Sequence, residues 1–153
     1  MSYLDPIFAS YPMQGFQDIW FLGLAPTEVE CLFEFACKTF GNGTVPICRD
    51  GETAFTMNMN TLYEVDYNFN PLIFNGVRLD GVAIRIEKDE LAIDFNGGID
   101  YWIDERQIAF IAWLHMLQNE APNAQLAWAH EGCVSTPSEN ESKLLRDAVA
   151  CAA

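Results

Sequence analysis

Residues 72–95 read LIFNGVRLDGVAIRIEKDELAIDF, and this stretch decides the fold. Asn75-Gly76 is a strong β-hairpin signal between two short apolar runs, residues 72–74 and 77–79. From Val82 to Phe95 apolar residues then recur at every second position, with a turn near residues 88–89. Alternation of this kind predicts strands, and the short links between them predict an antiparallel meander.

The same alternation extends to both sides of this stretch. Residues 55–69 alternate between apolar and polar side chains over a length of about 50 Å in extended form, which is too long for one strand. We therefore expect a bend or hairpin near residues 58–61. A further short strand is predicted near residues 124–128, where Ala124, Leu126 and Trp128 alternate with polar or small residues.

Three helices are indicated by residues typical of N-terminal caps, in which a Thr or Asp is followed closely by Glu or Gln. The pairs are Thr27 with Glu30, Asp104 with Gln107, and Thr136-Pro137 with Glu139. The helix after Asp104 is apolar almost all round, so we expect it to be central and buried on more than one side. The helix at about 137–150 has a weaker apolar stripe and is expected at the edge of the domain.

The order of these elements favours an α+β fold. We expect an antiparallel meander sheet of about five to seven strands, with three main helices packed largely on one face. Half of the 153 residues are apolar, which is enough for a sizeable core. A single globular domain spanning residues 1–153 is therefore predicted.

The charge excludes several classes of partner. The chain has 22 acidic and 8 basic side chains, for a formal net charge of −14, and such a surface repels nucleic-acid phosphates and anionic membranes. The five cysteines are odd in number and form no CxxC pair, which is typical of free thiols in a reducing compartment. The apolar start lacks the basic residues of a signal peptide, so a cytoplasmic location is expected.

Acidic side chains cluster between Asp80 and Glu105, a segment that contains eight carboxylates and two basic residues. Strand alternation also places Glu64, Asp66, Glu87 and Asp94 opposite apolar neighbours, so we expect these carboxylates to share the open side of the sheet. One interpretation is a docking surface for a basic protein. The alternative is an ordinary solvated face whose charge serves solubility.

Tyr101 and Trp102 lie beside Asp100 in this acidic segment. Because Tyr and Trp often anchor interfaces, they are candidate contact residues, although a place in the core is the alternative. The complete predicted partner-binding set is Glu64, Asp66, Glu87, Asp94, Asp100, Tyr101 and Trp102.

No metal, cofactor or catalytic site is predicted. Residues 94–105 place oxygen-bearing side chains at several EF-hand positions, but Ile99 stands where that loop requires Gly. His130 lies near Cys133, and Cys48 or His115 could join them, but this spacing is not specific for zinc or for a nucleophile. His115, within an apolar helix, is more typical of a hydrogen-bonded core residue.

These features favour a small acidic protein that binds, and thereby inhibits or chaperones, a basic protein partner. In its small size, acidic charge, expected α+β fold and lack of catalytic motifs, the chain is similar to bacterial immunity proteins, antitoxins and other protein inhibitors, although it shares no specific motif with them. One alternative is a small-molecule-binding domain or minor enzyme with a pocket between the central helix and the sheet. A second alternative is a nucleic-acid mimic, which would need regular rows of carboxylates. The oligomeric state stays open.

Overall fold

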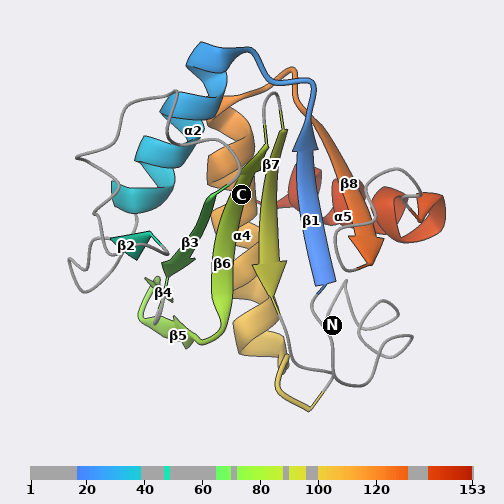
Figure 1. Cartoon of the computed structure of the whole chain (residues 1–153). Coiled ribbons are helices and arrows are strands. Elements are labelled where there is room, and N and C mark those ends of the chain that lie inside the picture. The colour runs from blue at the N-terminus through green and yellow to red at the C-terminus, as the bar shows by residue number, and fades with distance from the viewer. Residues whose placement is uncertain are drawn as a thin grey trace.

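The computed structural model describes residues 17–38, 47–48, 65–69, 72–87, 90–95, 100–130 and 138–152. For residues 17, 37–38, 47–48, 65–69, 85–87 and 130 it describes the backbone alone. The predicted bend at residues 58–61 lies outside these ranges. Within them, an antiparallel sheet lies in front of two helices in the view of Figure 1, and a third helix lies beside the sheet. The predicted α+β fold class is confirmed.

The main sheet has six strands in the order β2-β3-β6-β7-β1-β8, and every neighbouring pair is antiparallel. Strand β1, which the sequence did not predict, inserts between β7 and β8 and so joins the meander to the strand that follows the central helix. The bounds are β1 Gln17–Leu22, β2 Ile47–Cys48, β3 Val65–Phe69, β6 Val82–Glu87, β7 Glu90–Phe95 and β8 Gln125–His130.

The predicted hairpin at Asn75-Gly76 is confirmed, but it forms a sheet of its own. Strands β4 (Leu72–Phe74) and β5 (Val77–Leu79) pair only with each other. Asn75 and Gly76 have φ angles of 51° and 77°, the left-handed values that a tight two-residue hairpin turn requires. The hairpin buries Leu72, Phe74 and Leu79 in the main core instead of extending the sheet.

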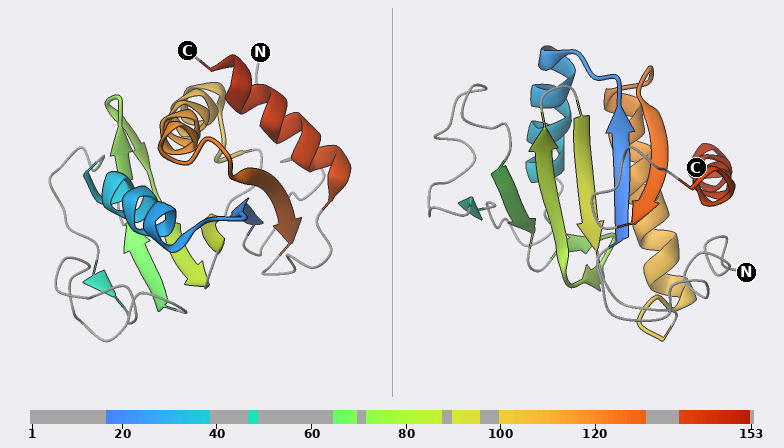
Figure 2. Two further views of the ribbon diagram at one scale, coloured as in Figure 1. Left: turned by 90° about the horizontal axis from the view of Figure 1, so that it is seen from above. Right: turned by 45° about the vertical axis from the view of Figure 1, so that its right-hand side comes forward.

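The three predicted helices are present. Helices α2 (Pro26–Lys38) and α4 (Asp104–Glu120) lie against the same face of the sheet, and α5 (Glu139–Cys151) lies beyond the outer edge of β8 (Figures 1 and 2). Residues on the inner sides of α2 and α4 share one apolar cluster with β1, β6, β7 and β8. Aromatic rings fill the space between α4 and the sheet, where Phe95 meets Trp102, Phe110 and Trp128 edge-on at centroid distances of 5.1–5.5 Å.

The helix caps differ from those predicted. Helix α2 begins at Pro26, two residues before the start that a cap at Thr27 implies, and the Glu28 carboxylate accepts a hydrogen bond of 2.9 Å from the backbone N–H of Ala25. The residue before α4 is Ile103, so Asp104 is the first helical residue. Before α5 stands Ser138, whose hydroxyl donates to the Glu141 carboxylate, while Thr136 lies outside the described residues.

Helix α5 protects the free edge of the sheet. The N–H of Trp128 donates to the hydroxyl of buried Ser142 at 2.8 Å, and the Trp128 carbonyl accepts from the N–H of Ser138 at 3.0 Å. The Arg146 guanidinium adds a bond of 3.0 Å to the carbonyl of Leu126. Because unpaired edge strands invite pairing with other chains, these bonds close β8 against edge-to-edge association.

No helix within the described ranges is long and apolar enough to cross a bilayer.

Candidate functional site

The outer side of α4 exposes apolar side chains that its sequence led us to expect inside. Ile108 is 59% exposed and Met116 is 37% exposed, with half-buried Ala112 between them. These three residues follow each other at intervals of four and therefore lie along one stripe of the helix. The expectation that α4 is buried on more than one side is confirmed, because its buried residues face the sheet, α2 and α5, but Ile108 and Met116 stay exposed.

The same helix begins in an acidic and apolar turn. Asp100, Asp104 and Glu105 are exposed, and Ile103 between them is 47% exposed. Carboxylates in a first helical turn favour the helix through its dipole, but the dipole gives no reason for the exposed isoleucines. We call the set Asp104, Glu105, Ile108, Ala112 and Met116 the outer α4 face.

Tyr101 fixes the loop that leads into this face. Its hydroxyl accepts a hydrogen bond of 2.7 Å from the N–H of Asp80, at the end of the β4-β5 hairpin. Arg106 lies 4.4 Å above the Tyr101 ring and donates to the Tyr101 carbonyl at 2.8 Å. Tyr101 is half-buried, so this predicted contact residue holds the loop before α4 in place and exposes only part of its side chain.

Trp102 is fully buried and cannot touch a partner, so the prediction that it is a contact residue is corrected. Its ring packs against Phe95 and Phe110, with centroids 5.5 Å and 5.0 Å away. Its carbonyl accepts a hydrogen bond of 2.6 Å from the side chain of Gln107, which is itself 1% exposed. Gln107 was predicted to cap the helix, but it ties the helix to the loop before it.

Asp94 does not lie on an open sheet face. It is only 9% exposed, and the strand register places it directly opposite Asp18 of β1, which is also buried. Asp18 was not predicted, because the sequence gives no sign that β1 pairs with β7. The same side of the sheet also buries a small apolar cluster over β1, β7 and β8, formed by Trp20, Ala92, Ala127 and Ala129.

The other predicted sheet carboxylates are described less fully. Glu64 lies outside the described residues. Asp66 pairs with Arg85, and Glu87 pairs with Glu90, in the backbone register, while the side chains of Asp66 and Glu87 are not described. Among the fully described candidates, Asp100 is exposed and Tyr101 is half-buried in the loop before α4, and neither belongs to the outer α4 face.

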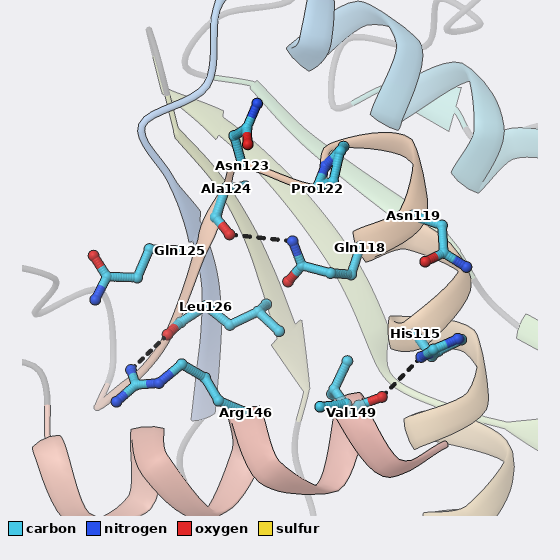
Figure 3. A pocket seen from close by; sticks show the side chains of 11 residues that line it. His115, Gln118, Asn119, Pro122, Asn123, Ala124, Gln125, Leu126, Arg146 and Val149 are labelled. Atoms are coloured by element: carbon cyan, nitrogen blue, oxygen red, sulfur yellow. Dashed lines mark hydrogen bonds between the residues drawn. The ribbon is translucent and has the colours of Figure 1, made fainter. Parts of the chain in front are cut away.

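A pocket of about 490 Å³ lies where the end of α4 meets β8 and α5 (Figure 3). Gln118 reaches across from α4 and donates to the carbonyls of Ala121 and Ala124 at 2.9 Å and 3.1 Å. His115 Nδ1 lies 2.8 Å from the Val149 carbonyl of α5. Because a carbonyl only accepts, Nδ1 carries the proton in this contact.

The pocket is not where we expected one. The predicted space between the central helix and the sheet is filled by aromatic rings, whereas the pocket lies at the far end of α4. His115 makes the hydrogen bond expected of a core histidine but is half-buried and lines this pocket. The His130 side chain, Glu131 and Cys133 lie outside the described groups.

Metal-ligating groups do not converge in the described part of the chain. No three His, Cys, Asp or Glu residues there are placed to hold one ion. Asp100 and Glu105, two members of the calcium-loop pattern, are exposed, whereas Asp94 is buried in β7. Asn96, the remaining member, lies outside the described residues.

Comparison with known proteins gives no further guide, because no family, no curated protein and no solved structure matches the chain. The site therefore rests on geometry alone. One signal for the outer α4 face was present in the sequence: the helix is apolar on more sides than one sheet can cover. The position of the uncovered side depends on where α2 and α5 pack, which the sequence does not reveal.

Proposed function

We propose that this protein binds a basic protein partner through the outer α4 face. The observation that carries the proposal is the exposure of Ile108 and Met116 on a helix whose other sides are packed. Contiguous apolar patches rimmed by polar residues mark interaction sites, and Ile108, Ala112 and Met116 form a continuous stripe with carboxylates at one end. The proposal keeps the predicted kind of partner but moves the binding surface from the sheet to the helix.

The chemistry of the face selects the partner. Asp104 and Glu105 precede Ile108 by one helical turn and so lie beside it, while the neighbouring cation Arg106 is turned onto Tyr101. A surface of lysine or arginine around an apolar centre complements this arrangement, with charge guiding the encounter and apolar contact holding the complex. The net charge of −14 disfavours nucleic acid and anionic membrane as direct partners.

The proposed action is occlusion. A rigid acidic surface that covers a basic protein blocks or shields the partner's own binding site without chemistry. The bonds from Gln107 to Trp102 and from Tyr101 to Asp80 support such rigidity, because they fix the loop before α4 in place. A pre-organised face loses little conformational entropy on binding.

The test is affinity capture from an extract of the native source, followed by titration of the captured protein. Ile108→Ser should weaken binding at least fivefold, about 1 kcal/mol, because it removes an apolar anchor from the centre of the face. Glu105→Lys should weaken binding more at low salt than at high salt, because screening removes its charge effect.

The matched control for Ile108→Ser is Leu144→Ser on α5. Leu144 is also an exposed aliphatic residue, at 39%, but it lies on another helix. Glu34→Lys on α2 is the charge control. Equal effects of the two serine variants, or of the two lysine variants, would refute the outer α4 face as the docking surface. If only Asp66→Lys and Glu87→Lys weakened binding of the partner, the binding surface would lie on the sheet instead.

A further inference from the structure

The pocket at the end of α4 is lined mainly by aliphatic surface and has one fixed hydrogen-bond acceptor. Its apolar walls come from Pro122 and Ala124 of the connecting loop, Leu126 of β8, and Val149 and Ala150 of α5. Its volume of about 490 Å³ falls in the range of sites for small organic molecules. None of its lining residues belongs to the outer α4 face, although His115 and Asn119 follow Ala112 and Met116 by three positions and so adjoin that face. The role inferred for the pocket does not rest on the proposed function.

Gln118 is the amide with a fixed orientation in the pocket, whose lining also includes the polar residues Asn119, Asn123 and Gln125. Both hydrogens of its Nε2 are used, by the Ala121 and Ala124 carbonyls, and this fixes the orientation of the amide. The oxygen is therefore turned to the Leu126 side of the cavity, as Figure 3 shows. Among the described residues none donates to this oxygen, so a ligand that donates a hydrogen bond would satisfy it.

The charge of the lining disfavours ionic ligands. Among the described lining residues, Arg146 is the one with a formal charge, and it is held by the Leu126 carbonyl at 3.0 Å and by the Glu139 carboxylate at 2.7 Å. An anion would meet a guanidinium already paired with Glu139, on a chain with net charge −14. A cation would meet the same guanidinium directly. Neither sign of charge gains a partner.

We propose that this pocket binds an uncharged small molecule with an apolar body and a hydrogen-bond donor directed at Gln118 Oε1. The apolar body would cover Leu126 and Val149, and the donor would complete the hydrogen bonding of the Gln118 amide. His115 Nδ1 is already engaged with the Val149 carbonyl, so it holds α4 and α5 together at the pocket wall.

Four compounds that share one ring system test the donor and the charge separately: indole, 1-methylindole, indole-3-acetate and tryptamine. Each is titrated into the full chain while amide resonances are followed by NMR. Indole should shift the Gln118 side-chain amide and the Val149 backbone amide. 1-Methylindole, which lacks the donor, should bind about 3- to 10-fold more weakly, as expected for one lost hydrogen bond. The anion and the cation should also bind at least threefold more weakly.

Ala150→Trp provides the test on the protein side. Ala150 is exposed and lines the pocket, so a bulky ring there should obstruct the site without entering the core. The control is Asn140→Trp, an exposed residue of the same helix outside the pocket lining. Ala150→Trp should abolish the indole shifts, whereas Asn140→Trp should leave them unchanged. The proposal would be overturned if indole caused no shifts, or if Ala150→Trp left the indole shifts unchanged. It would also be overturned if 1-methylindole bound as tightly as indole, or if either ion bound more tightly than indole.

Discussion

At the scale of the residue, single polar groups fix the segment that leads into α4. Gln107 is buried and donates to the Trp102 carbonyl, and Tyr101 accepts from the Asp80 N–H. Neither bond could be predicted from the sequence, because spacing alone does not tell a capping Gln from a Gln buried beneath a loop. Both bonds keep Ile103 and Ile108 in their positions on the surface.

Gln107→Leu should lower the free energy of unfolding by about 1–3 kcal/mol, because a buried carbonyl loses its donor. For a chain of this length that corresponds to a fall in Tm of roughly 2–12 °C. Thermal unfolding followed by circular dichroism measures it. The control, Gln125→Leu, changes an exposed glutamine and should shift Tm by less than about 2 °C. A similar Tm for both variants would show that the hydrogen bond from Gln107 to the Trp102 carbonyl does not contribute to stability.

At the scale of the element, the edge of β8 is covered, whereas the outer side of α4 is exposed. Helix α5 satisfies the backbone groups of β8 through Ser142, Ser138 and Arg146. No comparable element covers the Ile108 stripe of α4 within the described structure. One edge is therefore closed to other chains, while the apolar stripe stays open to them.

Ser142→Ala should destabilise the contact between α5 and β8 by about 1–3 kcal/mol, because the buried N–H of Trp128 loses its acceptor. Hydrogen exchange measured by NMR should show the Trp128 amide exchanging about 5- to 100-fold faster when local opening controls exchange. Asn140→Ala, an exposed change on the same helix, is the control. Unchanged exchange at Trp128 in Ser142→Ala would contradict the role of α5 as an edge cover.

At the scale of the whole molecule, the sequence predicts the fold class better than it predicts the site. The hairpin at Asn75-Gly76 and strands β6 and β7 follow from local turn chemistry and alternation, so they could be predicted. The insertion of β1 between β7 and β8 depends on long-range pairing, which local patterns do not encode. For the same reason Asp94 was expected on an open face, and its burial beside Asp18 was not.

The fold shows where part of the net charge of −14 is located. Part of the acidic excess between Asp80 and Glu105 lies in the sheet, with Asp94 buried, and part lies at the start of α4 with Asp100, Asp104 and Glu105 exposed. Among the described residues, the second part accompanies exposed apolar side chains. Charge and apolar surface together, rather than charge alone, identify the surface that we propose for docking.

Site-specific photo-crosslinking in an extract of the native source tests the central claim most directly. A benzophenone side chain is placed at position 108 on α4 in one variant and at position 144 on α5 in another, and each is illuminated at low and at high salt. We expect a crosslink to a basic protein from position 108, weaker at high salt, and none to that protein from position 144. No crosslink from position 108, or equal crosslinks from both positions, would contradict the central claim.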